Sequence, residues 1–197
     1  MALPRFNKKL NIYSSLAKKK GINNVPGVDM IDDPSLTYEF IMGNLEALHS
    51  NCVGPIIDHF NNLPGSSGNS IGITSAYRCK ELNAAINPPG VKNSQHIKGY
   101  AVDLIYTEGE ASELFNWAIL NLPTWGQMIW EFPEKGAFSG GNYSPSWLHI
   151  SYQEGKNNKD LSLASSREDL HEYYKGTNTT RRGVYTHGIT DADQTLI

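Results

Sequence analysis

Cysteine is scarce in this sequence, and its scarcity removes one class of metal site. The 197 residues include two cysteines, Cys52 and Cys79, and these do not form a Cys-x-x-Cys pair. Two isolated thiols are not a disulfide framework, and they cannot build a zinc site that needs several thiolates. A metal site in this chain would therefore depend on histidine and carboxylate ligands.

The chain also lacks long apolar runs and a strong charge of either sign. No stretch approaches the ~20 apolar residues that span a bilayer, and residues 1–10 lack the apolar core of a signal peptide. The formal net charge of −3 favours neither nucleic acid nor an anionic membrane as a partner. We therefore expect no nucleic-acid partner, no membrane insertion, and a protein made in the cytoplasm without a standard export signal.

The residue pattern predicts one main domain with two flanking segments. Hydrophobic residues make up 39% of the chain and charged residues 19%, which is sufficient for a packed core. Turn-forming residues make residues 1–33 an irregular segment by prediction. Residues 34–155 then form the domain, and residues 156–197 contribute a short helix over 166–174 and a polar tail.

Within the domain, hydrophobic spacing predicts a mixture of helices and strands. A long helix starts at Asp33-Pro34 and is kinked or split at Gly54-Pro55. Two further helices are expected over 80–86 and 111–120. Strands are expected over 71–77, 101–106, 127–132 and 147–152. Because helices and strands do not alternate regularly, we predict an α+β fold with a mainly antiparallel central sheet flanked by helices.

Three polar side chains lie in positions that favour a metal site. Strand alternation turns Asp103 and His149 away from the most apolar faces of their strands. Gly99 permits a sharp turn that can bring His96 back beside Asp103. Two imidazoles and one carboxylate are a common catalytic zinc set with an open fourth position. Each feature alone also fits a structural role, so the interpretation depends on the three occurring together.

A wider set of motifs resembles the family of zinc D-Ala-D-Ala carboxypeptidases and L-alanyl-D-glutamate endopeptidases, whose fold hedgehog signalling domains share. The resemblance is carried, in order, by Ile73-Thr74-Ser75-Ala76-Tyr77-Arg78, Ser94-x-His96-x-x-Gly99-x-Ala101-x-Asp103 and Trp147-x-His149. It implies a hedgehog/DD-peptidase-like fold.

The same resemblance implies roles for individual residues. His96, Asp103 and His149 would bind Zn²⁺. Arg78 would contact the substrate and polarise the scissile carbonyl, and Ser94 would lie near the substrate.

The catalytic base is the point where the sequence departs from this family. Many members carry an acid three residues before the last histidine, and here that position is Ser146, which cannot act as a base. Glu131 is the alternative, because it lies in a Gln-x-Ile-Trp-Glu-Phe stretch that resembles phage and bacterial members. A carboxylate in this role accepts a proton from water and passes it to the leaving amine. We predict Glu131 as the base, with Glu134 in reserve.

The resemblance implies a zinc metallopeptidase that hydrolyses peptide bonds in peptidoglycan stem peptides. Both the D-Ala-D-Ala carboxypeptidase type and the L-Ala-D-Glu endopeptidase type fit the motifs. Without a leader sequence, a phage-type lysis enzyme or a virion-associated hydrolase is a further expectation, in which the protein acts on the cell wall after release or as part of the particle. The alternative is a catalytically silent zinc-binding module of the same fold, which the serine at position 146 favours.

Overall fold

A five-stranded sheet forms the centre of the computed structural model, which describes residues 6–87, 89–131, 147–156 and 160–164. The strand order is β1-β2-β4-β3-β5. The pairs β1–β2, β2–β4 and β4–β3 are antiparallel, and the pair β3–β5 is parallel. The strands are β1 (Ile71–Ser75), β2 (Ala101–Tyr106), β3 (Gln127–Glu131), β4 (Trp147–Ser151) and β5 (Asp160–Ala164).

Four of these strands lie where the hydrophobic pattern predicts them, so the α+β class with a mainly antiparallel sheet is confirmed. The fifth strand was not predicted. Its sequence, Asp-Leu-Ser-Leu-Ala, alternates over too few residues to stand out, and its partner β3 is distant in the sequence. The helix predicted over 166–174 lies outside the described residues.

The long predicted helix is split at the predicted place but begins later than expected. It consists of α3 (Tyr38–Leu48), a π-helical turn η2 (His49–Val53) and α4 (Gly54–Asn61). Pro55 lies in the first turn of α4, where a missing backbone N–H is tolerated.

The start predicted at Asp33-Pro34 is wrong. The side chain of Thr37 caps α3 by accepting from the backbone N–H of Phe40 at 3.1 Å. Asp33 instead accepts a hydrogen bond from the hydroxyl of Ser35 at 2.6 Å. The Asp33 side chain therefore closes a local turn before the helix.

The described part of the N-terminal segment contains three short helices, contrary to the prediction of an irregular segment. It contains α1 (Lys8–Ile12), α2 (Ser15–Lys20) and η1 (Val28–Ile31). These helices are too short to show a hydrophobic period. Instead, the buried amide of Asn24 ties the segment to the domain, because it donates to the carbonyl of Tyr77 at 3.1 Å and accepts from the N–H of Cys79 at 2.7 Å.

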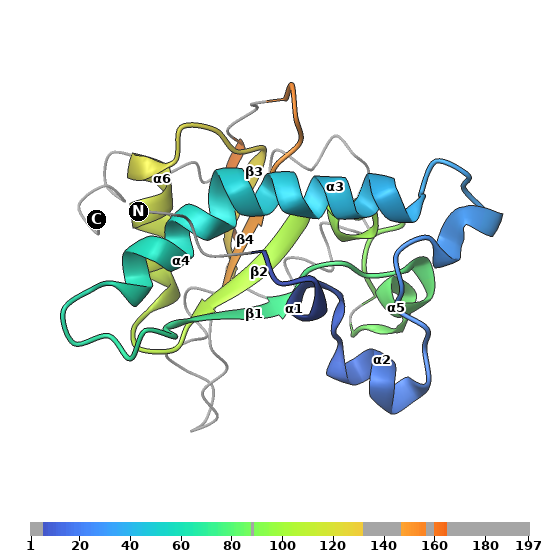
Figure 1. Ribbon diagram of the computed structural model, residues 1–197, viewed down its shortest axis with the longest axis horizontal. Coiled ribbons are helices and arrows are strands. Elements are labelled where there is room, and N and C mark those ends of the chain that lie inside the picture. Colours follow the sequence, from blue (N-terminus) through green and yellow to red (C-terminus); the bar gives the residue numbers. More distant parts are fainter. Residues whose placement is uncertain (1–5, 88, 132–146, 157–159, 165–197) are drawn as a thin grey trace.

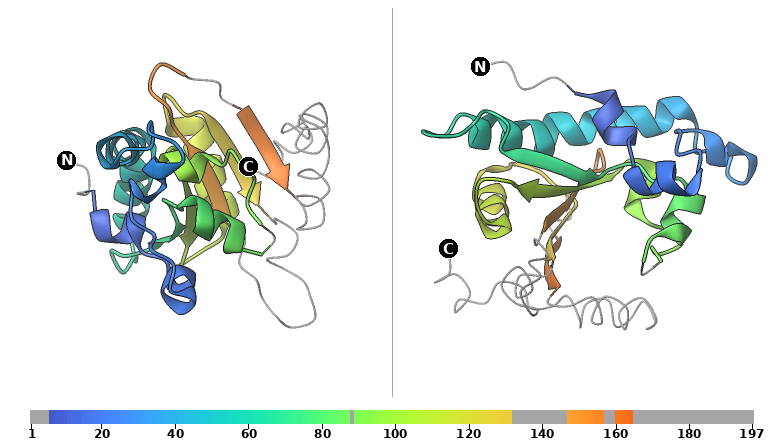
Figure 2. Two further views of the ribbon diagram at one scale, coloured as in Figure 1. Left: turned by 90° about the vertical axis from the view of Figure 1, so that its right-hand side faces the viewer. Right: turned by 90° about the horizontal axis from the view of Figure 1, so that it is seen from below.

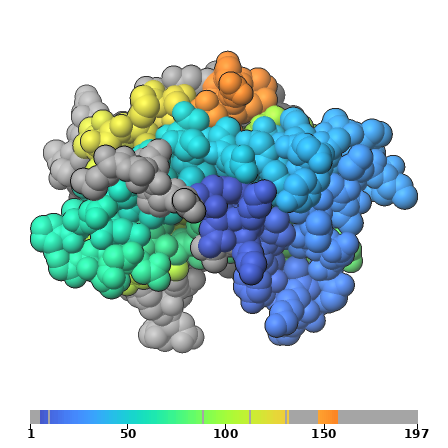
Figure 3. Space-filling view, in the orientation of Figure 1, coloured from blue at the N-terminus to red at the C-terminus, as the bar shows by residue number. Residues whose placement is uncertain are grey.

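The apolar core lies between the sheet and a layer of helices. Helices α3 and α4 run in succession across the sheet in Figure 1, and Figure 2 shows them (cyan to blue-green) as a layer beside the strands. The helix α6 (Ala111–Asn121) contacts β2, β3 and β4. In Figure 3 the N-terminal residues (dark blue) lie against α3, and Phe6 packs edge-on against His49. The strands contribute Val102, Leu104, Leu148 and Ile150 to this core.

Because neighbouring residues of a strand point to opposite faces, Asp103 and His149 project from the other face of the sheet. Residues of two short helices, α5 (Lys80–Ala85) and η3 (Gln95–Lys98), line a cavity together with these two side chains. Within the ranges that the structure describes, no helix combines the length and the apolar character needed to cross a bilayer.

Candidate metal centre

Strand register places Asp103 and His149 side by side. Asp103 of β2 is paired with His149 of β4, and His149 is paired on its other side with Ile129 of β3. Directly paired residues on antiparallel strands project from the same face of the sheet. The Nδ1 atom of His149 consequently lies 2.8 Å from Oδ1 of Asp103.

His96 reaches the same point from the turn that precedes β2. It belongs to η3, and the residue that caps this helix, Gly99, has φ +71°. A Cβ atom at position 99 would lie 2.6 Å from the backbone oxygen of Ile41, so both the backbone angle and the packing require glycine. The turn brings Nε2 of His96 to 3.4 Å from Oδ1 of Asp103.

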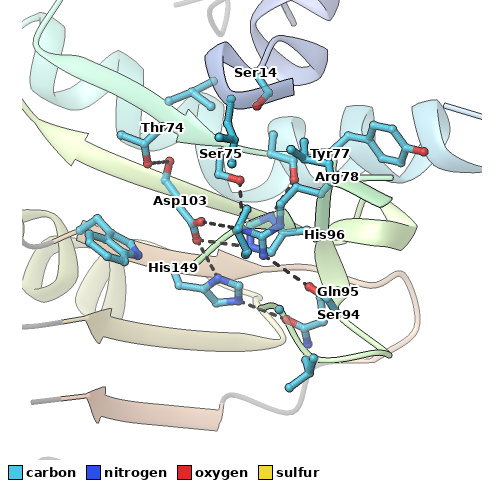
Figure 4. A pocket seen from close by; sticks show the side chains of 18 of the residues that line it. Ser14, Thr74, Ser75, Tyr77, Arg78, Ser94, Gln95, His96, Asp103 and His149 are labelled. Atoms are coloured by element: carbon cyan, nitrogen blue, oxygen red, sulfur yellow. Dashed lines mark hydrogen bonds and ion pairs between the residues drawn. The ribbon is translucent and has the colours of Figure 1, made fainter. Parts of the chain in front are cut away.

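The three predicted metal-binding side chains therefore converge. One donor atom from each of His96, Asp103 and His149 lies within 4.8 Å of the others. The three residues are buried, with exposed fractions of 3%, 8% and 7% respectively. Figure 4 shows the carboxylate of Asp103 facing both imidazole rings.

The protonation of His96 indicates what this cluster is suited to bind. Its Nδ1 lies 2.7 Å from the carbonyl oxygen of Ala76, which can only accept, so Nδ1 carries the proton. Burial, with the nearby charge of Arg78 adding to it, lowers the pKa of His96 to about 4. At neutral pH the lone pair of Nε2 therefore faces a carboxylate oxygen, and two acceptors in that geometry are stabilised by a cation between them.

Asp103 supplies negative charge to the cluster. Burial alone would raise the pKa of this carboxyl group, but the adjacent imidazoles of His96 and His149 outweigh that effect and hold the pKa well below its ordinary range. An ionised carboxylate beside two imidazole nitrogens is a donor set that suits Zn²⁺. The residues present thus fit the metal that the sequence predicts.

A cavity of about 520 Å³ opens beside these three side chains. The volume is in the range of small-molecule binding sites. Arg78, which follows β1, lies on its wall, and its guanidinium lies 3.8 Å from Oδ2 of Asp103 and 3.5 Å from the hydroxyl of Ser94. Both residues predicted to bind substrate are therefore next to the predicted metal ligands.

Glu131 lies on the same side of the sheet as the cluster. It is the last residue of β3, two positions after Ile129, which is paired with His149. Residues two apart on a strand share a face, and Glu131 lines the cavity. Its role as a base stays a prediction. The other two positions weighed for that role, Glu134 and Ser146, lie outside the described residues.

Sequence reasoning missed two contributions to the cavity. Residues 13–16 of the N-terminal segment form part of the cavity wall. This contribution was missed because the segment was predicted to be irregular, and nothing in its sequence indicates that it packs beside the site. Gln95 lies between Ser94 and His96, and its side-chain oxygen is 3.3 Å from Nε2 of His149. The position of Gln95 inside the Ser-x-His motif was a sign in the sequence that it lies near the site. Its contact with His149 could not be predicted, because that contact depends on strand pairing.

A match to a known protein family covers part of this site. The fold and the His-Asp-His cluster together define an α+β protein with a group of side chains that could hold a metal ion. The family described as Peptidase M15 matches residues 34–126, a little under half of the chain. That match supports the zinc D-Ala-D-Ala carboxypeptidase type of family and suggests a metallopeptidase. No curated protein matches the chain.

The matched segment and the metal cluster overlap only in part. The match includes His96 and Asp103 but ends before Glu131 and His149. For His149, the evidence is its convergence with the other two donors. The N-terminal wall of the cavity also lies outside the matched residues.

Proposed function

We propose that this protein is a zinc metallopeptidase that hydrolyses peptide bonds in the stem peptides of peptidoglycan. The observation that carries the proposal is the convergence of His96, Asp103 and His149 within 4.8 Å beside a cavity. Two imidazoles and one carboxylate leave a coordination position open, as catalytic zinc sites require. The Peptidase M15 match to residues 34–126 supports the same class of reaction.

In this proposal His96, Asp103 and His149 hold the metal. Bound zinc supplies Lewis acidity, which lowers the pKa of water toward about 7. Glu131 accepts the proton of the attacking water and returns it to the leaving amine. Glu131 projects from the same face of the sheet as His149 and lines the cavity, which is compatible with this task.

Arg78 and Ser94 position the substrate. The guanidinium is charged at all relevant pH values and can hold two oxygens of a carboxylate, or the developing oxyanion, in a planar fork. The hydroxyl of Ser75 accepts a hydrogen bond from Nη1 of Arg78 at 3.3 Å, which restrains the guanidinium toward the cavity. Of the charged side chains that line the described part of the cavity, Arg78 is the cation.

The direct test is digestion of purified peptidoglycan, followed by mass spectrometry of the released fragments. New D-alanine would identify a carboxypeptidase, and free L-Ala and D-Glu termini would identify an endopeptidase. Both results would support the proposal. A zinc-loaded protein that releases neither would instead support a silent binding module.

Glu131→Gln is predicted to abolish hydrolysis while zinc stays bound, because the amide keeps the shape of the side chain but cannot accept the proton. The loss should be at least about 100-fold in kcat, the usual range for a general base. Glu154→Gln is the matched control, since Glu154 is exposed and does not line the cavity. Full activity in the Glu131 variant would exclude it as the base.

A further inference from the structure

Gln95 makes a contact with His149 that the proposed roles leave unused. The amide oxygen of Gln95 lies 3.3 Å from Nε2 of His149, on the side of the ring away from Asp103. The other ring nitrogen, Nδ1, lies 2.8 Å from Oδ1 of Asp103. The imidazole of His149 is thus held between an amide and a carboxylate (Figure 4).

The two neutral tautomers of His149 differ in what they offer to a metal. With the proton on Nδ1, the ring donates to Asp103, and its lone pair on Nε2 points away from His96. With the proton on Nε2, the ring donates to Gln95, and the lone pair of Nδ1 points to the place that Nε2 of His96 and Oδ1 of Asp103 also face. Only the second tautomer gathers three metal donors at one point.

We propose that Gln95 is a positioning residue that selects the Nε2–H tautomer of His149 and so presents Nδ1 to the metal; this inference rests on the proposed function. The carbonyl of Ala76 does the same for His96 from the opposite nitrogen, since it accepts from Nδ1 and leaves Nε2 as the donor. The two histidines therefore bind through different ring nitrogens, each selected by an oxygen on the far side of its ring.

Backbone hydrogen bonds fix the position of Gln95 relative to His149. The carbonyl of Gln95 accepts hydrogen bonds from the N–H groups of Gly99 and Tyr100, the latter at 3.0 Å. The N–H of Tyr152, which directly follows β4, in turn donates to the carbonyl of Tyr100 at 2.9 Å. The turn that carries Gln95 is thereby fixed to the strand that carries His149.

An amide is suited to this role because its oxygen accepts a hydrogen bond without adding a charge. Gln95→Met keeps the length of the side chain but removes the acceptor. Zinc affinity, measured by competition with a chromogenic chelator, should fall about 10- to 100-fold, as it does when partners of metal-binding histidines are removed. Gln95→Glu keeps an oxygen at the same place and should restore the affinity to within a few-fold of wild type.

A spectroscopic readout separates positioning from general loss of structure. In the zinc-loaded wild-type protein, nitrogen chemical shifts of His149 should identify Nδ1 as the metal-bound atom and Nε2–H as a slowly exchanging proton. Gln95→Met should accelerate that exchange. Asn93→Ala is the matched control, because this exposed amide lines the same cavity two residues away and should change neither quantity.

The outcomes separate the two proposals. Wild-type protein that binds no zinc would overturn the proposed function and this inference together. Zinc bound through Nε2 of His149, or affinity unchanged by Gln95→Met, would overturn the inference about Gln95 alone. The assignment of the wild-type nitrogens needs no variant, so the test holds even if Gln95→Met fails to fold.

Discussion

At the scale of single residues, the site depends on how each donor is oriented by a neighbour. His96 is directed by the carbonyl of Ala76, and its Nε2 faces Asp103. The same burial that shields these groups keeps His96 neutral, which is the form that binds metal. Burial and the hydrogen bond to Ala76 thus leave Nε2 of His96 unprotonated, as a metal ligand must be.

Acidification is predicted to destabilise the metal-free protein between about pH 6.5 and pH 4. The ordinary pKa of 6.5 applies to His96 in the unfolded chain, while burial lowers it to about 4 in the folded state. In that window the unfolded chain binds the extra proton, so the free energy of unfolding falls as the pH falls. The loss attributable to His96 is on the order of 3 kcal/mol across the window. Asp103, whose pKa is depressed, adds its own loss only below about pH 4.

Urea denaturation in the presence of a chelator, repeated across this pH range, measures the effect. The variant His96→Gln should show a shallower dependence of stability on pH, because the titrating group is removed. A variant that keeps the wild-type slope would show that His96 is not the group responsible.

At the scale of elements, the turn between η3 and β2 is the most demanding feature. Gly99→Ala should destabilise the fold by at least about 2 kcal/mol, because it combines the cost of a positive φ with a contact to the backbone of Ile41 that cannot move aside. Gly21→Ala is the control, since Gly21 has φ +69° but nothing within 4 Å of the added Cβ. That control should lose only about 1 kcal/mol.

Thermal or urea unfolding of both glycine variants gives the comparison. Gly99→Ala should also weaken zinc binding, because the turn carries His96, whereas Gly21→Ala should leave zinc affinity at the wild-type value. Equal losses of stability in the two variants would mean that the packing against α3 adds nothing to the backbone cost.

The N-terminal segment is a second element whose attachment can be tested. Asn24→Ala removes the acceptor for the buried N–H of Cys79 and the donor to the carbonyls of Ile12 and Tyr77. Buried polar groups left without these partners should lower the free energy of unfolding by about 2–4 kcal/mol. Asn62→Ala, an exposed amide that bonds locally to Asp58, should change stability by less than about 0.5 kcal/mol. Similar effects of the two substitutions in urea denaturation would contradict the attachment of the N-terminal segment through Asn24.

At the scale of the whole molecule, metal binding should couple to stability, because the donors come from β2, β4 and the turn before β2. Zinc at about 1,000 times its Kd adds about 4 kcal/mol to the folded state. For a chain of this length, removal of zinc by a chelator should lower Tm by roughly 10 °C. Differential scanning calorimetry of wild type and His149→Ala, each with and without chelator, tests this. The variant should not respond, and a response equal to that of wild type would place the bound metal elsewhere.

Local patterns were enough to predict most of the fold around the site. The bounds of β2 and the break before α4 follow from alternation and from Gly54-Pro55. The direction of Asp103 and His149, away from the apolar core, follows from the period of a strand, which is a property of consecutive residues. The resemblance of motif order then suggested which polar residues meet.

The amino-acid sequence by itself determined which faces of the strands are apolar, where the chain turns sharply at Gly99, and which side chains are able to bind zinc, because each depends on neighbours within a few residues. Only the tertiary structure decided that β4 lies beside β2 with His149 opposite Asp103, that Gln95 reaches His149, and that the N-terminal segment walls the cavity. These features depend on the pairing of segments far apart in the chain, which local periodicity does not encode.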